Sequence, residues 1–564
     1  MGACRRYLAL VALMGFCCFN FINSAAQEQM EFTVNNAREI LKSRGEIIVR
    51  FIKPGSARMS ELTKMISVDR VSGDTVTAYA NESEYEQFLK LGISYEVLTP
   101  PSLKKGIFNE LKAVPSDWRT RYLSYPEYLE LMNSLASAYP DLCKLYEFGT
   151  SVGGRKLLAL KISDNPSVTE QEPALMYSST IHGDETVGYV LLLRLADYLL
   201  SNYATDQSIR ELVNFAEIWI NPLANPDGTY YVSNASVEGA RRYNLNDQDL
   251  NRDFPDPDDG SVSGIRQPET TYMMTLMSQI HLVLSANFHG GIEVVNYPWD
   301  TWTKLHPDND WYETISRAYA NTAQANSPAS YMDDLDNGIT NGNAWYEIDG
   351  GRQDYANYYL RAREVTIELS YYHTPSESSL DDYWNYNKQS LLAYLTNAMT
   401  GVNGLITDSV TGQHIEAFVS LKDHDYDHSE ILSWENDGTY YRMLLEGDYT
   451  LVFSKEGYKS KQISVHVTDG NMSTLNVRLA PLIIDNLYPN PSSGYLYFNL
   501  ENAGEVLTIE IADLSGRIVK KNVSKVTISG IQVIDVSELS PGIYISRIIY
   551  GDMVFQQAVI KAQK

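Results

Sequence analysis

EPALMYSSTIHGDETVGYVLLLRLADYLLSNY, residues 172–203, joins a short apolar strand pattern to a long amphipathic helix pattern. Three later apolar runs have the same strand character: FAEIWINPL, IHLVLSANF and EVTIELS. Helical patterns separate these runs, and strands that alternate with helices indicate a mostly parallel or mixed sheet. We therefore expect an α/β region from about Trp118 to Met399.

Two polar residues follow the first of these strands, at its joint with the helix. His182 and Glu185 are three residues apart, and we expect Glu185 in the first turn of the helix. In an open α/β sheet, ligands bind beyond the carboxyl ends of the strands. The pair is therefore either part of a metal site or an ordinary polar turn with an acidic helix start, and alone it is a weak signal.

Two later residues favour the metal site. His289 ends the strand in LVLSANFHGG, and two histidines with one carboxylate form a three-ligand zinc site that keeps a fourth position for catalysis. Glu368 lies inside the apolar strand VTIELS, where burying a carboxylate is unfavourable unless it has a partner or a function. Near zinc it can accept a proton from the bound water, whose pKa falls to about 7.

The composition is that of a soluble protein with several domains. The hydrophobic fraction of 44% and charged fraction of 21% are ordinary for globular chains. The length of 564 residues exceeds the ~250–300 residues at which a single core stops growing. A formal net charge of −26 argues against nucleic acid or an anionic membrane as a partner and suits an extracellular surface.

The N-terminus has the pattern of an export signal. Arg5 and Arg6 precede the apolar run YLALVALMGFCCFNFI, and small residues follow it, so we expect a signal peptide over residues 1–26. A membrane anchor or a lipoprotein is the alternative. Only Cys143 lies beyond this segment, so we expect no internal disulfide, and export without disulfides indicates a bacterium. No other apolar run is long enough to span a bilayer, so we expect no transmembrane helix in the mature chain.

Seven motifs in the α/β region resemble those of the zinc metallocarboxypeptidases of the carboxypeptidase A type. They are, in the family's order, HGDE, NPDG, DLNRDFPD, NFHGG, NYPWD, YEIDGGRQDY and TIELS. The resemblance implies a hydrolase that removes the C-terminal residue of peptides and proteins and holds one Zn²⁺ in its catalytic domain. It implies that His182, Glu185 and His289 are the zinc ligands and that Glu368 is the general base.

The same resemblance assigns residues to the substrate. It implies that Asn251 and Arg252 bind the terminal carboxylate, and that Arg242 polarises the scissile carbonyl. Tyr346 resembles the mobile tyrosine that closes over substrate, and Asp249 resembles the carboxylate that is hydrogen-bonded to a zinc histidine. A guanidinium suits this task because it recognises a planar carboxylate through two parallel hydrogen bonds.

Parts of the chain are more similar to the regulatory subgroup, the carboxypeptidases D, E and N. The segments HGGIEVVNYPWD and GGRQDY resemble that subgroup, which implies that Asp300 binds a basic side chain with Gln353 nearby. We therefore predict a preference for C-terminal Lys or Arg. Asp253 and Asp247 depart from the subgroup, which usually has asparagine and glycine there, so the substrate groove is expected to differ.

Resemblances also organise the rest of the chain. An N-terminal α+β unit resembles the prosegments of secreted carboxypeptidases, and the first β region resembles a transthyretin-like module. The expected organisation is a signal peptide (1–26), a prosegment-like α+β unit with its linker (27–112), a mixed-sheet α/β catalytic domain (113–400) and two all-β sandwich domains (401–481 and 482–564). Cleavage after the linker lysines is expected to relieve latency.

The last region, from LYPNPSSG to QQAVIKAQK, resembles the C-terminal sorting domains of the type IX secretion system of Bacteroidetes. This implies export through the periplasm to the cell surface or the medium, with the type IX machinery as a partner. Three alternatives to the main hypothesis are a catalytically inactive binding protein, a zinc peptidase of cell-wall peptides, and a carboxypeptidase with neutral or aromatic preference.

Overall fold

The structure is a computed structural model of the whole chain. It describes residues 37–100, 102, 116–258, 260, 264–481, 487–500, 506–527, 530–550 and 553–563. The expected signal peptide and the linker segment 103–115 lie outside the described residues. The chain divides into two compact units, Met1–Met399 with Tyr426–Ser429, and Thr400–Asp425 with Glu430–Lys564, and each is described by itself.

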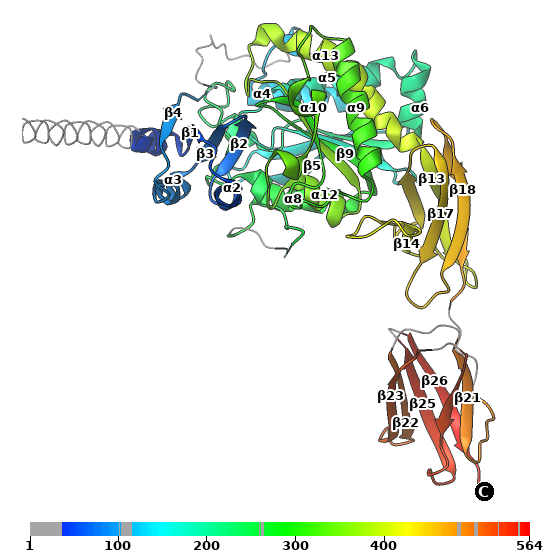
Figure 1. The fold of residues 1–564 in the computed structure, drawn as a ribbon. Helices are drawn as coiled ribbons and strands as arrows, with labels where there is room; N and C mark the ends of the chain where they lie inside the picture. The colour runs from blue at the N-terminus through cyan, green and yellow to red at the C-terminus, as the bar shows by residue number, and fades with distance from the viewer. Residues whose placement is uncertain are drawn as a thin grey trace, which may run out of the picture. The chain divides into compact units, whose positions relative to one another are not determined.

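An eight-stranded mixed sheet forms the centre of the first unit (Figure 1). Its order is β11-β10-β12-β9-β7-β8-β6-β5. The four central strands β12, β9, β7 and β8 are parallel to one another. The pairs β10–β12, β8–β6 and β6–β5 are antiparallel. The strands are β5 (Cys143–Thr150), β6 (Lys156–Ile162), β7 (Ala174–Ser179), β8 (Glu217–Asn221), β9 (Leu282–His289), β10 (Glu293–Tyr297), β11 (Ile339–Asn341) and β12 (Arg363–Leu369). The predicted α/β fold with a mixed sheet is confirmed.

Helices cover both faces of this sheet, which is why the central strands β7, β8, β9 and β12 are buried along their whole length. In Figure 1, α5 (Val187–Asn202), α9 (Asn309–Ala325) and α13 (Leu380–Thr396) lie above the sheet, and α8 (Pro268–Gln279) and α12 (Arg352–Tyr358) lie below it. All six residues of β7 are buried as a result. The remaining helices are α4 (Tyr125–Ala138), α6 (Gln207–Phe215), α7 (Pro226–Thr229), α10 (Asp334–Asn337) and α11 (Gly342–Trp345), with 3₁₀ turns η1 (Trp118–Thr120), η2 (Leu250–Arg252), η3 (Glu377–Ser379) and η4 (Asn397–Met399).

The start of α5 corrects one prediction. The helix begins at Val187 after the N-cap Thr186, so Glu185 precedes the helix and does not lie in its first turn. The N–H of Thr186 donates to the carbonyl oxygen of His373 at 2.9 Å. This contact with a distant segment fixes the turn between β7 and α5, and the sequence around Glu185 carries no sign of it.

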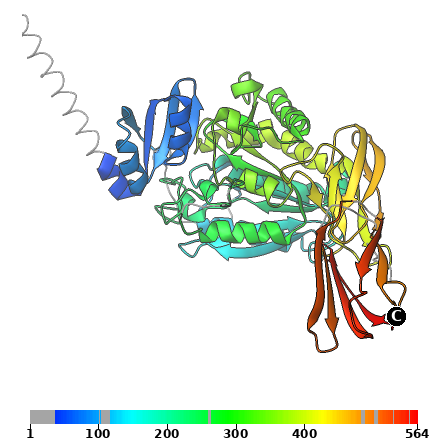
Figure 2. The ribbon, with the colours of Figure 1, turned by 60° about the horizontal axis from the view of Figure 1, so that its bottom comes forward.

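A small α+β unit precedes the mixed-sheet domain, which we call the catalytic domain after the expectation from the sequence, and packs against it (Figure 2). A helix through residue 44 leads into a four-stranded antiparallel sheet of order β2-β3-β1-β4. Its elements are β1 (Ile47–Ile52), α2 (Ser56–Thr63), β2 (Ser67–Ser72), β3 (Thr75–Ala80), α3 (Glu82–Leu89) and β4 (Tyr95–Leu98). We call residues 37–98 the N-terminal unit. Its apolar core is continuous with Ile292, Val294 and Trp345 of the catalytic domain.

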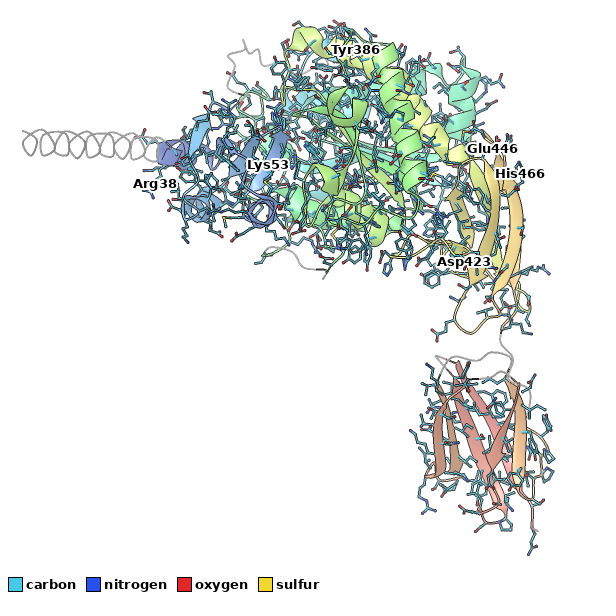
Figure 3. The ribbon with its side chains drawn as sticks, in the orientation of Figure 1. Arg38, Lys53, Tyr386, Asp423, Glu446 and His466 are labelled. Atoms are coloured by element: carbon cyan, nitrogen blue, oxygen red, sulfur yellow. The ribbon has the colours of Figure 1, made fainter. Side chains whose placement is uncertain are left out.

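The second unit is all-β, as predicted. Strands β13 to β20 form two sheets, of order β16-β13-β19 with β20 beside β13, and β15-β14-β17-β18. Their bounds are β13 (Gly401–Asp408), β14 (Phe418–Leu421), β15 (Ile431–Leu432), β16 (Thr439–Met443), β17 (Gly447–Ser454), β18 (Lys461–Val467), β19 (Met472–Thr474) and β20 (Val477–Leu479). Figure 3 labels His466, a residue of β18.

A further set of strands follows toward the C-terminus. Strands β21 and β24 pair, and β23-β22-β25-β26 form a second sheet around a core of their own. Their bounds are β21 (Tyr495–Leu500), β22 (Val506–Asp513), β23 (Ile518–Lys525), β24 (Gly530–Asp535), β25 (Gly542–Tyr550) and β26 (Met553–Lys561). In the part of the chain that the structure describes, no helix is long and apolar enough to cross a bilayer.

Candidate active site

His182, Glu185 and His289 converge beyond the carboxyl ends of β7 and β9. His182 Nδ1 lies 2.8 Å from Glu185 Oε1 and 3.1 Å from His289 Nδ1. His289 Nδ1 lies 2.8 Å from Glu185 Oε2. All three side chains are buried, so three ligand atoms of the types that zinc prefers meet at one water-poor point. We call these three residues the triad.

Both histidines are held by a second polar group behind the ring. His182 Nε2 lies 3.0 Å from Asp249 Oδ1, which fixes the proton on Nε2 and leaves Nδ1 as a ligand atom. His289 Nε2 lies 2.8 Å from the side-chain amide of Asn287, whose Oδ1 is buried without a hydrogen-bond partner among the described residues. With the amide turned so that Oδ1 accepts from Nε2–H, His289 Nδ1 also becomes a ligand atom. The donor set therefore fits a zinc ion.

Glu368 lies beside the triad on the neighbouring strand. It is the register partner of His289 across the parallel pair of β12 and β9. Its Oε2 is buried and has no hydrogen-bond partner in the described part of the chain. Burial, together with the carboxylates of Glu185 and Asp69, raises the pKa of Glu368 well above its usual range. A carboxyl group tuned in this way has the properties of a general acid or base.

Arg242 connects the triad to the N-terminal unit. Its Nη1 donates to Glu185 Oε1 at 3.1 Å and to Asp69 Oδ1 at 3.2 Å. Its Nε donates to Ser67 Oγ at 2.7 Å and to Asp249 Oδ2 at 3.3 Å. The guanidinium is buried and held on both edges, so it can present Nη1 to an oxygen near the triad without reorganising.

Two of the residues assigned to the substrate, Arg252 and Tyr346, instead donate to the backbone of β2. Arg252 Nη2 donates to the carbonyl oxygen of Val68 at 3.3 Å, and the Tyr346 hydroxyl donates to the carbonyl oxygens of Val68 and Asp69 at 3.4 Å. Asn251 Oδ1 accepts from the Arg352 N–H at 2.9 Å. Strand β2 of the N-terminal unit therefore occupies two of the side chains that the resemblance assigns to the substrate.

The pocket at the triad retains a free volume of only about 20 Å³. Its lining includes Asp300, Asn296 and Thr366. Asn296 Nδ2 donates to Asp300 Oδ1 at 2.9 Å, and burial raises the pKa of Asp300 to about 6. The Asp300 carboxylate accepts from an uncharged amide, so it retains the capacity to form an ion pair with a cationic ligand group.

Gln353 is not among the described residues that line this pocket. Its amide is buried, and neither its oxygen nor its nitrogen has a partner within the described residues. The next residue of α12, Asp354, accepts instead from the backbone N–H of Asp300 at 3.1 Å and of Thr301 at 2.8 Å. Neighbouring residues on a helix point about 100° apart, so the phase of α12 decides which one reaches Asp300.

The departures at Asp247 and Asp253 have local structural partners. Asp247 adopts φ 56°, a conformation that suits glycine, and its carboxylate accepts from Arg241 Nη1 at 2.6 Å. Asp253 Oδ2 accepts from the Gln267 N–H at 2.7 Å. Both carboxylates thus fix the loops around η2, which carries Asn251 and Arg252.

Sequence reasoning missed the residues that other segments bring to the site. Asp69 and Ser67 come from β2, and the alternation in SVDRVS before a Ser-Gly-Asp turn was the signal for that strand. His373 lies 2.9 Å from Asp69 through Nε2, and the Tyr79 hydroxyl donates to Asp184 Oδ2 at 2.8 Å. No sequence pattern pairs these residues, because their contacts span the two parts of the unit.

Comparisons with known proteins agree with the geometry. Residues 128–390 match the family described as zinc carboxypeptidase, and residues 486–562 match the secretion system C-terminal sorting domain. Human carboxypeptidase D is 32% identical over 446 residues, which cover 76% of this chain and 31% of that protein, so the chain spans about a third of that relative's length. The solved structure of carboxypeptidase A from Helicoverpa armigera aligns with TM-score 0.48 and 19% identity over 62% of this chain and 97% of that chain.

Two further relatives are matched over most of their length. Carboxypeptidase SOL1 of Arabidopsis thaliana is 34% identical over 389 residues, which cover 67% of this chain and 76% of that protein. The carboxypeptidase N catalytic chain of Mus musculus is 30% identical over 400 residues, which cover 64% of this chain and 86% of that protein.

Proposed function

Because this chain belongs to the zinc carboxypeptidase family, we propose that it is a secreted enzyme that removes C-terminal Lys or Arg from peptides and proteins. The observation that carries the proposal is the convergence of the triad with Glu368 and Arg242 beside a pocket lined by Asp300. A complete set of groups for hydrolysis supports an enzyme over an inactive binding protein.

His182, Glu185 and His289 would hold one zinc ion, which when bound supplies Lewis acidity and lowers the pKa of a water molecule. Glu368 then takes a proton from the attacking water and returns it to the leaving amine. Arg242 Nη1 donates to the oxygen that becomes negative as the carbonyl carbon turns tetrahedral. The outer partner Asp249 keeps His182 in the tautomer that ligates.

Recognition of a chain end follows from the charged groups beside the triad. Arg252 and Asn251 can bind a terminal carboxylate, with Tyr346 as a third donor, once the backbone of β2 no longer occupies Arg252 and Tyr346. A mid-chain amide has no negative charge to match the guanidinium. The arrangement therefore favours cleavage at the C-terminus of a peptide.

The preference for a basic residue rests on Asp300. A lysine or arginine side chain in the pocket would pair with the buried carboxylate, whereas an apolar side chain would leave it desolvated and alone. Leaving a buried charge unpaired costs roughly 2–5 kcal/mol. That range corresponds to a preference of about 30-fold to several thousandfold.

The test compares kcat/KM on matched peptides ending in arginine, lysine, leucine and phenylalanine, using the chain cut in its linker. Wild type should prefer arginine and lysine, and Asp300→Ala should lose that preference while still hydrolysing the neutral peptides. Asp141→Ala, at an exposed position away from the pocket, serves as the matched control. A wild type that prefers phenylalanine, a variant that still prefers arginine, or turnover of cell-wall peptides alone would contradict the assignment.

We also propose that the N-terminal unit keeps the enzyme latent. Strand β2 occupies Arg252 and Tyr346 through its backbone and Arg242 through Asp69, which leaves little free volume at the triad. Trypsin-like cutting after Lys104 or Lys105 of the linker should raise activity. Equal activity of the intact and cut chains would contradict latency.

The sorting domain supports export, and we propose that the type IX system recognises it. The enzyme would then act at the cell surface or in the medium after passing through the periplasm. This placement agrees with the formal net charge of −26 and with an expected signal peptide at the N-terminus.

A further inference from the structure

One carboxylate oxygen of the N-terminal unit accepts hydrogen bonds from two side chains of the catalytic domain. Asp69 Oδ1 lies 2.9 Å from His373 Nε2 and 3.2 Å from Arg242 Nη1. All three side chains are buried. The catalytic domain therefore contains a point where two donors converge on one anionic oxygen, and in this structure an internal carboxylate supplies that oxygen.

This point lies next to the triad. The same Arg242 Nη1 that donates to Asp69 also donates to Glu185 Oε1 at 3.1 Å. The ligand atoms of Asp69, Glu185 and His373 all lie within 4.8 Å of one another. If Arg242 polarises a scissile carbonyl, as its position beside the triad suggests, the carbonyl oxygen has to occupy nearly the place that Asp69 Oδ1 now fills.

His373 is anchored to the catalytic domain independently of β2. Its carbonyl oxygen accepts from the Thr186 N–H at 2.9 Å, in the turn that carries Glu185. From the N-terminal unit, Asp69 bonds to its Nε2 and the Tyr79 ring packs against it edge-on, with ring centres 5.9 Å apart. Burial by itself lowers the pKa of His373, but the carboxylates of Asp69 and, farther away, Asp184 and Glu185 raise it to about 10. The backbone of His373 is therefore held beside the triad by the turn that carries Glu185 and not by β2.

We infer that His373 is a second donor to the oxyanion formed during hydrolysis, beside Arg242, and that Asp69 takes the place of that oxyanion in the latent chain. This inference rests on the proposed function. Water adds to the carbonyl carbon, its proton passes to Glu368, and the π electrons of the carbonyl move onto its oxygen. That oxygen accepts from Arg242 and His373, the C–N bond then breaks, and Glu368 returns the proton to the amine. His373 donates throughout and transfers no proton.

Removing one preorganised oxyanion donor lowers kcat by about 10²–10³. In the wild-type chain cut in its linker, His373→Ala should therefore lower kcat by about a hundredfold and change KM by less than about threefold. His373→Gln keeps an N–H donor and should recover part of the loss. If His373→Ala fails to fold, as judged by zinc content and melting temperature, His373→Gln alone should still lower kcat.

A binding measurement separates an oxyanion role from a structural one. A phosphonate analogue of the peptide is tetrahedral and anionic like the transition state, so its inhibition constant should rise with the loss in kcat. Inhibition by free arginine, a ground-state product, should stay within about threefold of wild type. Equal weakening of both ligands would overturn the inference.

Asp69→Asn is the matched control, because it changes the other partner of the same hydrogen bond. It should raise the activity of the intact chain, because it removes the anion that fills the oxyanion position. If His373→Ala also activates the intact chain but leaves kcat of the cut chain within about threefold, His373 only holds Asp69 and the inference is overturned. A wild-type cut chain that hydrolyses no peptide would instead refute the proposed function itself.

Discussion

Glu368 on β12 and His289 on β9 are register partners on neighbouring parallel strands. Their side chains therefore leave the same face of the sheet at the same edge, and the hydrogen bonds of the sheet fix their separation. One strand supplies a triad member and the next supplies a carboxyl group outside the triad. Metal binding and proton transfer can consequently be removed one at a time.

Glu368→Gln should retain zinc and lose activity. The substitution removes the proton acceptor but leaves His182, Glu185 and His289 in place, and general-base catalysis is worth about 10²–10⁴-fold. Zinc content and kcat/KM of the cut chain check this. Glu130→Gln, at an exposed position of α4, is the control and should match wild type. Activity of Glu368→Gln within about tenfold of wild type would disprove the assigned role.

His289→Ala should lose both the metal and the activity, because a zinc site with two protein ligands binds far more weakly than one with three. We expect one zinc ion per wild-type chain after dialysis and well under one for the variant. His466→Ala is the matched control, since this imidazole is exposed on β18 and contacts Asp448 at 2.9 Å (Figure 3). A variant that keeps a full zinc ion would place the metal elsewhere.

Docking of the N-terminal unit should weaken as the pH rises. Glu46 is buried between that unit and the catalytic domain, and its Oε2 accepts from the N–H groups of Arg242 at 3.1 Å and Tyr243 at 3.5 Å. The charged groups around it are Asp184, Arg44 and Arg241. Burial, then the Asp184 carboxylate, raises the pKa of Glu46 to about 8.

The raised pKa means that Glu46 takes up a proton on docking. Docking is therefore strongest below the undocked pKa of about 4.3 and weakens by up to about tenfold per pH unit until about pH 8. Size-exclusion chromatography of the cut chain at about pH 5.5 and about pH 8.5 measures this. Glu46→Gln should flatten the dependence, and Glu82→Gln, exposed on α3, should not. Docking that tightens with rising pH would refute this role of Glu46.

Removing residues 482–564 should stop export and leave catalysis intact. The triad, Glu368 and the pocket all lie upstream of the sorting domain in the sequence. The truncated protein should therefore be folded, zinc-loaded and activatable, but retained in the periplasm. Activity assays on periplasmic and culture-medium fractions check this, and normal appearance of the truncated protein in the medium would argue against sorting by this region.

The sequence predicted the parts of the site that local patterns encode. His182 and His289 follow buried apolar strands, and Glu368 interrupts one, so strand periodicity and the cost of burying a charge were enough to bring them together. The order of the central strands, and the antiparallel flanks, depend on pairings between distant segments. No local sequence pattern predicts those pairings.

The parts that sequence reasoning missed depend on contacts between segments far apart in the chain. Asp69 reaches His373 from 304 positions away, and nothing within β2 identifies its partner. The contact of Asp354 with the backbone of Asp300 depends on the rotational phase of α12. Glu185 precedes α5 because the His373 carbonyl takes the Thr186 N–H. Tertiary contacts decide each of these cases.

In the latency that we propose, the N-terminal unit is a covalently tethered inhibitor that covers the triad. While residues 103–115 join it to the catalytic domain, it meets the groove at an effective concentration on the order of millimolar. After a cut, the same hydrogen bonds compete at the bulk concentration of the protein. On this proposal, dilution would activate the cut enzyme: the N-terminal unit would stay bound at high protein concentration and dissociate when the protein is dispersed.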